Sequence, residues 1–172
     1  AFAQELLGTI YWNADKPDQA IDGYKKAIEL DALPNKSQFS LLYRLAQMQL
    51  QSEKYEDSLA TLERWEKETG SQNSDELALK ANAYYRLDKF QPAIDTMKQA
   101  IAKAEKPNDS WSQILMASYF ELNQYDEAAK VVQAMLAKDP GNKKLINQLA
   151  QVYIQGDKPD QALQVLAKAK SD

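Results

Sequence analysis

Apolar residues between positions 109 and 142 recur at the spacing of one helical face. In the first half of this stretch they are Ile114, Leu115, Tyr119 and Leu122, and in the second half Ala128, Val131, Val132, Met135 and Leu136. Spacings of three and four residues predict amphipathic α-helices, and Asn123 and Gln124 indicate a turn between the two helices. The stretch therefore predicts a helical hairpin, which needs neighbours of the same kind to bury its apolar faces.

The same hairpin pattern returns along the whole chain. A small residue opens each expected second helix, at Ala20, Ser58, Ala93, Ala128 and Ala162. A second marker lies on each expected first helix, at Tyr11, Gln49, Tyr84, Tyr119 and Tyr153. Both series have separations of 38, 35, 35 and 34 residues. Two independent markers with one common period predict an array of repeats.

The pattern predicts about ten helices. They are expected at residues 2–14, 17–30, 38–51, 55–69, 74–87, 90–104, 109–122, 125–138, 143–155 and 159–170. An extra loop is expected around Pro34. Residues that suit a helix N-cap stand at Ser37, Ser74, Asp109 and Asn142. The chain is thus predicted to be all-α.

Composition and charge limit the classes of partner that the chain is expected to bind. The chain has 172 residues, a hydrophobic fraction of 44% and a formal net charge of −4. A globular fold is expected, and no Lys/Arg cluster offsets the negative charge, so we expect no nucleic-acid partner. No apolar run reaches the roughly 18 residues that span a bilayer, so the chain is not expected to be membrane-spanning.

The chain contains no cysteine and no histidine. Disulfides, thiolate metal sites and histidine-dependent nucleophilic catalysis are therefore excluded. No glycine-rich phosphate loop or nucleophile motif is present, and the carboxylates fall on predicted solvent faces and turns. We expect no enzymatic activity, no metal and no cofactor.

The marker positions carry a pattern that resembles the tetratricopeptide repeat family. Examples are Leu7-Gly8-x-x-Tyr11 followed by Ala20-x-x-x-Tyr24 and Ala27, and Leu149-Ala150-x-x-Tyr153 followed by Ala162 and Ala169. The resemblance implies a right-handed α-solenoid superhelix of five helix-turn-helix units in a single array over residues 1–172. The units are expected at 1–34, 39–70, 74–106, 109–142 and 143–172. Because the chain opens inside a helical pattern without a cap, we interpret it as a piece of a longer protein.

A narrower resemblance concerns the runs LLYRLAQMQLQSEKYEDSLATLERW, ANAYYRLDKF and DSWSQILMASYFELNQYDEA. They look like a periplasmic bacterial subgroup associated with the TonB–ExbB–ExbD system of outer-membrane uptake. This resemblance implies a periplasmic location and a protein partner within that system. A cytoplasmic location is the alternative.

The family resemblance also implies where a partner binds. First helices line the concave face of the superhelix, and the candidate peptide-binding groove residues there are Trp12, Tyr43, Gln47, Asn82, Tyr85, Arg86, Gln113, Phe120, Asn147 and Gln151. Carboxamides can pair with an extended peptide backbone, and aromatic residues can hold its side chains. One equivalent position of the repeat holds an apolar row, and the alternative is that this row packs between adjacent units: Trp12, Leu50, Tyr85, Phe120 and Ile154. Lys80 stands where other units have leucine, and is expected to extend to water or into the groove.

The sequence also bears on functions other than binding an extended peptide. The carboxylate clamp of chaperone-binding family members needs Lys and Asn on one first helix; Asn82 lacks that lysine, so a carboxy-terminal EEVD-type ligand is not expected. Carbohydrate binding by Trp12, Tyr43 and Tyr85 is an alternative. A second alternative is a structural module that associates weakly through its ends, because Phe2, Leu6 and Ile10 at one end and Leu163 and Leu166 at the other are apolar.

Overall fold

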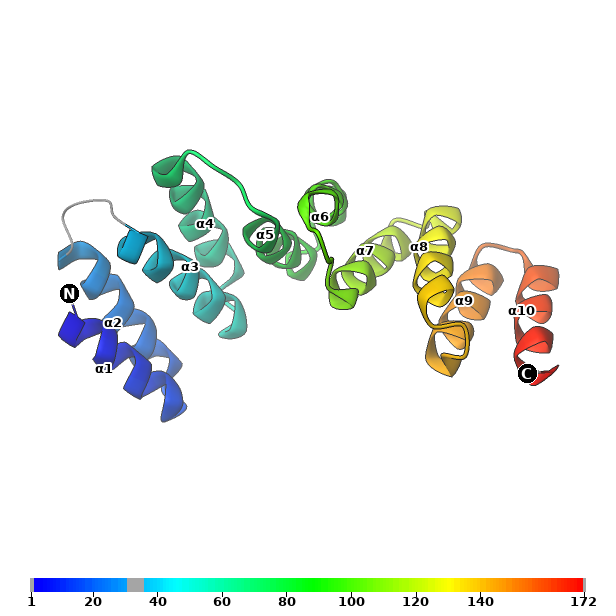
Figure 1. Ribbon diagram of the computed structural model, residues 1–172, viewed down its shortest axis with the longest axis horizontal. Coiled ribbons are helices and arrows are strands. Elements are labelled where there is room, and N and C mark those ends of the chain that lie inside the picture. Colours follow the sequence, from blue (N-terminus) through cyan, green and yellow to red (C-terminus); the bar gives the residue numbers. More distant parts are fainter. Residues whose placement is uncertain (1, 31–35, 172) are drawn as a thin grey trace.

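The computed structural model describes residues 2–30 and 36–171, and these residues form ten α-helices and no strand (Figure 1). The helices are α1 (Phe2–Asn13), α2 (Pro17–Leu30), α3 (Lys36–Gln51), α4 (Tyr55–Thr69), α5 (Ser74–Arg86), α6 (Phe90–Lys103), α7 (Asp109–Glu121), α8 (Tyr125–Lys138), α9 (Lys143–Gln155) and α10 (Pro159–Ser171). No helix among them is long and apolar enough to cross a bilayer.

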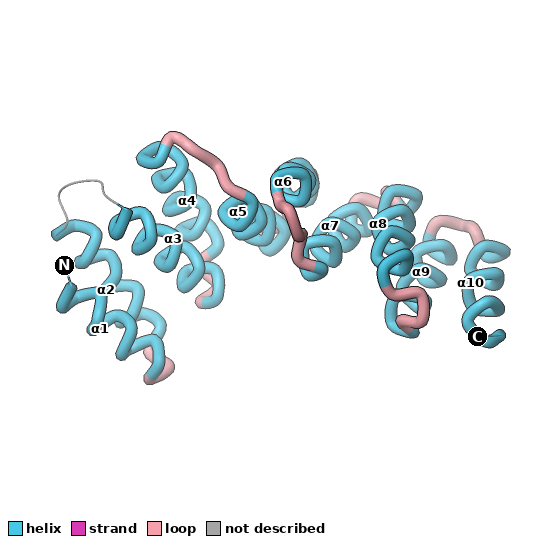
Figure 2. The backbone as a smooth tube through the Cα atoms, in the orientation of Figure 1, coloured by secondary structure: helices cyan, strands magenta, loops and turns pink. Residues whose placement is uncertain are grey.

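Each helix packs chiefly on the helices before and after it in the sequence. The array is elongated, with its two termini at opposite ends and short loops between the helices (Figures 1 and 2). This arrangement is an α-solenoid, so the predicted fold class is confirmed. Every helix lies within two residues of its expected bounds. The loop expected around Pro34 falls on residues 31–35, outside the described residues, and the predicted unit boundaries stay a prediction.

The turn within each hairpin has one common geometry. A residue with positive φ stands in every such turn, at Asp15, Glu53, Asp88, Asn123 and Asp157. Aspartate and asparagine tolerate this left-handed conformation better than most residues. The next residue donates its backbone N–H to the carbonyl of the first-helix marker, for example Lys16 to Tyr11 at 2.9 Å and Lys158 to Tyr153 at 2.8 Å. These bonds match the repeat register derived from the sequence.

The helix starts differ from the expected caps at three places. Ser37 is the second residue of α3 rather than the residue before it. The N-cap of α5 is Asn73, whose Oδ1 accepts the Glu76 N–H at 2.8 Å, and the N-cap of α7 is Asn108. Ser74 and Asp109 are the first residues of those helices. Asn142 caps α9 as predicted. At α5 and α7 the error arose because two residues able to cap are adjacent at both sites.

Small residues let the helices of a hairpin approach closely. Ala20, Ala93 and Ala128 have no exposed surface, and Ala162 has only 2%. In the second hairpin Ser58 replaces this alanine, and its Oγ donates to the Ala46 carbonyl at 2.8 Å. The hydroxyl is therefore satisfied without widening the helix pair.

Most of the buried apolar side chains among the described residues belong to two clusters. One lies among α2, α3 and α4 and runs from Ala20 to Trp65. The other lies among α5 to α9 and runs from Leu77 to Val152. The boundary between the two clusters lies between α4 and α5, although these helices are in contact.

Candidate functional site

Several hollows lie between successive odd-numbered helices. We call the side chains that line them the odd-helix face. An α1–α3 hollow is lined by Thr9, Trp12, Tyr24, Arg44, Gln47, Met48 and Gln51. An adjoining α3 hollow is lined by Glu5, Phe39, Ser40, Tyr43, Arg44, Gln47, Trp65, Asn73 and Asp75. An α7–α9 hollow is lined by Met116, Ala117, Phe120, Glu121, Gln148, Gln151 and Val152.

The two hollows near the N-terminal end share Arg44 and Gln47. The α3 hollow has a volume of about 550 Å³, within the usual range of ligand pockets. It combines aromatic side chains with the carboxylates of Glu5 and Asp75. Trp12, Tyr43 and Gln47, which the sequence selects, therefore meet along these adjoining hollows.

Hydrogen bonds fix one wall of the α1–α3 hollow. The Tyr24 hydroxyl is 2.7 Å from Thr9 Oγ1, and Arg44 Nη1 donates to it at 3.5 Å. Arg44 Nη1 is also 3.9 Å from a carboxylate oxygen of Glu5. These contacts join α1, α2 and α3 at the site and leave Trp12 half-buried beside them.

The Tyr43 hydroxyl lies in a partly desolvated and acidic environment. Burial raises the pKa of Tyr43, and the negative charges of Asp75 and Glu76 raise it further, while a hydrogen bond with Gln47 opposes them. Tyr43 therefore stays a neutral phenol at physiological pH and can both donate and accept hydrogen bonds to a ligand.

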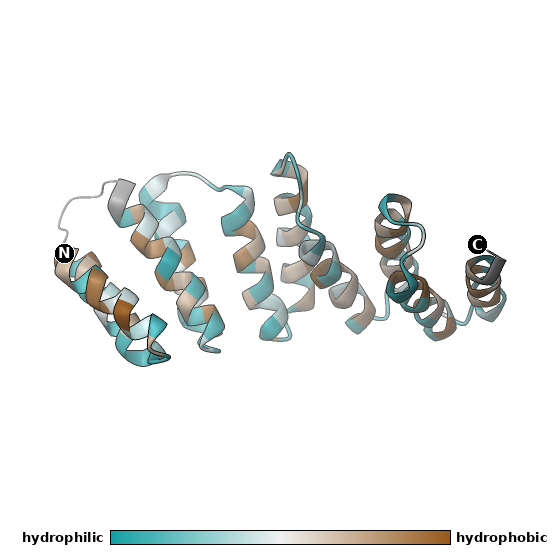
Figure 3. Cartoon of the chain, turned by 60° about the horizontal axis from the view of Figure 1, so that its bottom comes forward, coloured by the Kyte–Doolittle hydropathy of each residue, from teal (hydrophilic) through white to brown (hydrophobic). Residues whose placement is uncertain are grey.

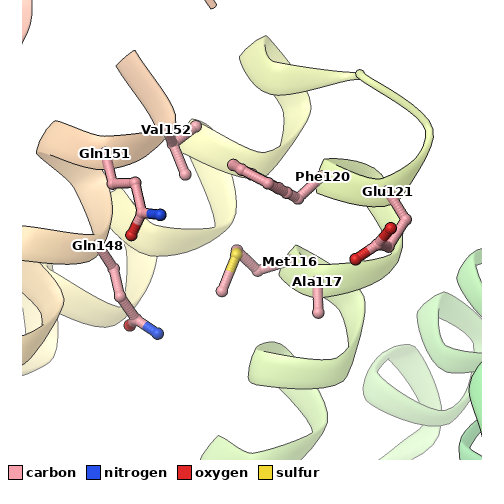
Figure 4. A pocket seen from close by; sticks show the side chains of 7 residues that line it. All are labelled: Met116, Ala117, Phe120, Glu121, Gln148, Gln151 and Val152. Carbon is pink, nitrogen blue, oxygen red and sulfur yellow. The ribbon is translucent and has the colours of Figure 1, made fainter. Parts of the chain in front are cut away.

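The α7–α9 hollow is more apolar (Figure 4). Met116 and Phe120 reach into it from α7, and Val152 closes it from α9, where the carboxamides of Gln148 and Gln151 lie beside it. Its volume of about 150 Å³ is that of a void able to accept a benzene-sized group. The hollow thus fits one apolar side chain, with amide groups placed beside it.

The three candidates on α5 have surroundings that differ from those of the candidates in the hollows. Asn82 and Tyr85 are half-buried, and the Tyr85 ring packs on Phe90 with centroids 5.8 Å apart. Arg86 is exposed, but its Nε donates to the Tyr55 hydroxyl at 3.0 Å and its guanidinium lies 5.3 Å from the Tyr55 ring centroid. The Tyr85 ring thus packs within its own hairpin, whereas Arg86 contacts the preceding hairpin through Tyr55, and the role of both residues in binding stays a prediction.

Two further candidates, Gln113 and Asn147, have carboxamides that are either already hydrogen-bonded or located on a different surface. Gln113 and Gln148 exchange hydrogen bonds between α7 and α9 at 3.3 and 3.1 Å, so the Gln113 amide is already engaged. Asn147 lines an end hollow between α9 and α10, together with Lys143, Ile146, Leu163, Leu166, Ala167 and Ala169. Asn147 is thus separated from Phe120 and Gln151, which do share a hollow.

Arg44 and Gln148 line these hollows, but the sequence pattern did not identify them as candidates. They occupy one repeat position, five residues before the first-helix marker, where the other hairpins have Leu6, Leu79 and Ile114. A polar residue at a position that is otherwise apolar was the signal that could have identified both.

Comparisons with known proteins agree with this architecture. A tetratricopeptide repeat family model matches residues 5–73 and 78–142, and a second tetratricopeptide repeat model matches residues 119–172. The interferon-induced protein with tetratricopeptide repeats 2 of Cricetulus griseus is 33% identical over 88 residues, 49% of this chain. Its Homo sapiens counterpart is 34% identical over 97 residues, 52% of this chain. The chain spans only 18% and 20% of the length of these two relatives.

Solved structures show the same fold. A crystal structure of MamA matches with a TM-score of 0.83 at 20% identity, covering 98% of this chain and 88% of that one. YrrB, described as a TPR protein with an unusual peptide-binding site, matches with a TM-score of 0.76 at 19% identity, covering 96% and 82%. At these identities the likeness concerns the fold.

The stacked hairpins and their hollowed face define a helical repeat scaffold. The chain belongs to the tetratricopeptide repeat family. Such scaffolds typically bind proteins or peptides and are typically not enzymes. The fold is therefore consistent with a protein–protein interaction role.

Proposed function

We propose that the chain binds an extended segment of a partner protein along the odd-helix face. The observation that carries this proposal is the α7–α9 hollow, where an apolar cavity formed by Met116, Phe120 and Val152 lies next to the Gln151 carboxamide. An extended peptide presents an apolar side chain and an unpaired backbone amide within a few ångströms of each other. This hollow can accept both groups at once.

The α3 hollow supports the same proposal at the other end of the array. It is larger, and its lining carries the carboxylates of Glu5 and Asp75 and one cation, Arg44, which lies 3.9 Å from Glu5. A segment with an apolar residue at one end and a lysine or arginine toward the other end fits the two hollows in charge and polarity. The peptide-binding site described for YrrB, which shares the fold, supports a peptide ligand.

The location and pathway belong to this proposal as well. We propose a periplasmic protein that acts as an accessory to TonB-dependent envelope transport. The support is the sequence resemblance of the runs at 41–65, 81–90 and 109–128 to periplasmic members of that group. Fractionation of the native host, with detection by a specific antibody, tests the location: recovery only in the cytosol contradicts it.

Loss of the α7–α9 hollow is expected to weaken peptide binding by more than tenfold. The change is Phe120→Ala with Gln151→Ala, which removes the aromatic wall and the amide together, and a binding hot spot contributes on this scale. The probe is a peptide selected from a random library on the unchanged chain, and its affinity is measured by calorimetry. The ratio of the dissociation constants of the variant and the unchanged chain reports how much the hollow contributes to peptide binding.

The matched control is Gln155→Ala, an exposed glutamine on the same helix α9 that does not line the hollow. It should leave the affinity unchanged. Equal affinities for the double variant and the control, with circular dichroism intact, contradict binding in this hollow. Preferential selection of glycans over peptides in a parallel array favours the carbohydrate alternative.

A second function, head-to-tail association of copies through their ends, is favoured by the register of α1. Ile10 on this helix is 54% exposed. The residues at the same repeat position in the other hairpins are all at most 8% exposed: Met48, Ala83, Ser118 and Val152. Leu6 is 50% and Phe2 78% exposed on the same helix. Figure 3 shows several apolar (brown) positions along the helices at the N-terminal end of the array. Within the described residues, α1 thus leaves exposed a face that the other first helices bury.

The opposite end offers the complementary surface. The end hollow between α9 and α10 is lined by Ile146 and Leu166, and Leu163 beside them is 65% exposed. We therefore expect concentration-dependent association, which analytical ultracentrifugation measures, and its loss in Ile10→Glu and in Leu163→Glu. Mixing these two variants should restore dimers but no larger species, because one intact head and one intact tail remain. Monomers at all concentrations contradict this function.

A further inference from the structure

The junction between α4 and α5 is built unlike the other junctions between hairpins. Three equivalent positions, one on a second helix and two on the next first helix, are apolar elsewhere. They are Ile28, Leu41 and Leu45 at the first junction, Ile101, Trp111 and Leu115 at the third, and Leu136, Leu145 and Leu149 at the fourth. At the second junction the same positions hold Glu66, Glu76 and Lys80, which we call the polar triplet.

Two members of the polar triplet form a sheltered ion pair. Lys80 Nζ lies 3.1 Å from both carboxylate oxygens of Glu66, and the two side chains are only 13% and 19% exposed. Gln72 Nε2 also donates to Glu66 Oε1 at 2.9 Å. Lys80 therefore neither extends to water nor points into the groove, and that sequence expectation is wrong because Glu66 on α4 holds it.

The third member is fully buried. Glu76 has no exposed surface, and among the described residues neither of its carboxylate oxygens has a hydrogen-bond donor. Burial of an unpaired carboxylate is costly, so the neutral acid is favoured. A protonated Glu76 gains an O–H that it can donate to the neighbouring Glu66 carboxylate, whereas two ionised carboxylates only repel each other.

The groups around Glu76 also favour its protonated form. Burial, and then the hydrogen bond and negative charge of Glu66, raise the pKa of Glu76 to about 8, although Lys80 and Lys103 oppose the shift. Tyr43 on α3, which stays neutral, also lies near Glu76, and the negative charges of both Glu76 and Asp75 act on it. Burial would raise the pKa of Glu66 too, but hydrogen bonds from Glu76, Lys80 and Gln72 lower it below its usual value.

We propose that the polar triplet makes the α4–α5 junction a proton-sensitive hinge between the two halves of the array. With a proton on Glu76 the triplet is closed by a chain of contacts from Glu76 through Glu66 to Lys80. Loss of that proton leaves two carboxylates against one ammonium at the boundary between the two apolar clusters. The α4 and α5 helices then separate more readily, and the α3 hollow that spans Tyr43, Trp65 and Asp75 changes with them.

The direction in which pH changes the folding stability follows from the linkage between proton binding and folding. Glu76 holds its proton more tightly in the folded chain than in the unfolded chain, whose glutamate pKa is near 4.5. Between about pH 4.5 and 8 the folded state thus binds more protons, so stability falls as the pH rises. The Glu66 contribution has the opposite sign and is lost only as the pH falls below about 4.5. Since the chain has no histidine, few other groups titrate between pH 5.5 and 7.

Thermal and urea unfolding of the whole chain from pH 5.5 to 8.5 test the hinge. We expect the unfolding constant to rise with pH by up to about tenfold per unit. Glu76→Gln, a neutral isostere of the protonated acid, should remove this dependence, and Glu63→Gln, an exposed glutamate on α4, should keep it. Equal slopes in the unchanged chain and Glu76→Gln overturn the proposal.

Two measurements make the result independent of any single variant. Carbon-13 NMR of the glutamate carboxyls should show one resonance, absent in Glu76→Gln, that titrates well above pH 6; titration of every carboxyl below pH 5 overturns the proposal. The triple change Glu66→Ile, Glu76→Leu and Lys80→Leu copies the first junction and should join the two apolar clusters. Hydrogen exchange at the start of α5 should then become pH-independent after correction for intrinsic rates, whereas an unchanged pH dependence contradicts the hinge.

Discussion

Ala128→Phe is expected to lower the free energy of unfolding by about 3 kcal/mol, at the upper end of the range for overpacked cores. Ala128 has no exposed surface and lies at the start of α8, within the larger apolar cluster. A phenyl ring there must displace buried members of the same cluster, which includes Leu115 and Tyr119, or separate α7 from α8. Because protein interiors are close-packed, neither response is free.

Chemical unfolding followed by circular dichroism measures this effect. Ala134→Phe is the matched control, since Ala134 is exposed on the same helix α8 and a ring there meets solvent. It should change the free energy of unfolding by less than about 0.5 kcal/mol. Wild-type stability in Ala128→Phe would show that the repeat register, and with it the assignment of the buried faces, is wrong.

The helices could be predicted because their signals are local. A period of three and four, proline in the first turn of second helices, and aspartate or asparagine at the turns all act within a few residues. Lys16 and Lys158 therefore donate to the expected marker carbonyls of Tyr11 and Tyr153. The caps Asn73 and Asn108 were missed by one residue, because local chemistry alone does not separate two adjacent capping residues.

The candidate site was less predictable because it depends on how hairpins face each other. Position in the repeat selected Trp12, Tyr43 and Phe120, which do line hollows. It could not reveal that Gln113 is engaged with Gln148 from another helix, or that Asn147 faces the end hollow. Which candidates bind a partner stays a prediction.

The polar triplet shows the same limit. The sequence identifies Lys80 as a departure from leucine, but its partner Glu66 lies 14 residues earlier on α4. Only the packing of α5 on α4 brings them together and encloses Glu76. A charged residue in an apolar repeat position thus indicates that a compensating partner exists, and the structure is needed to name it.

Gly8→Ala is expected to destabilise the first hairpin by about 1–3 kcal/mol, although the same change in a free helix would stabilise it. A methyl group at Gly8 would lie 2.7 Å from Tyr24 Cδ2, 2.8 Å from Tyr24 Cε2 and 3.1 Å from the Ala20 carbonyl oxygen. The ring cannot move aside easily, because Tyr24 is 1% exposed and its hydroxyl is 2.7 Å from Thr9 Oγ1. We expect α1 to move away from α2 instead.

Hydrogen exchange by mass spectrometry should show faster exchange in α1 and little change in α7 to α10. Gly141→Ala is the control, since beyond its two chain neighbours no described heavy atom lies within 4 Å of the added methyl, and it should be neutral or slightly stabilising. Because Thr9 and Trp12 line the α1–α3 hollow from α1, a peptide bound there should lose affinity in Gly8→Ala, while a peptide bound in the α7–α9 hollow should not. Unchanged exchange in α1 together with undiminished stability would mean that α1 and α2 are not held as closely as the Gly8–Tyr24 contact requires.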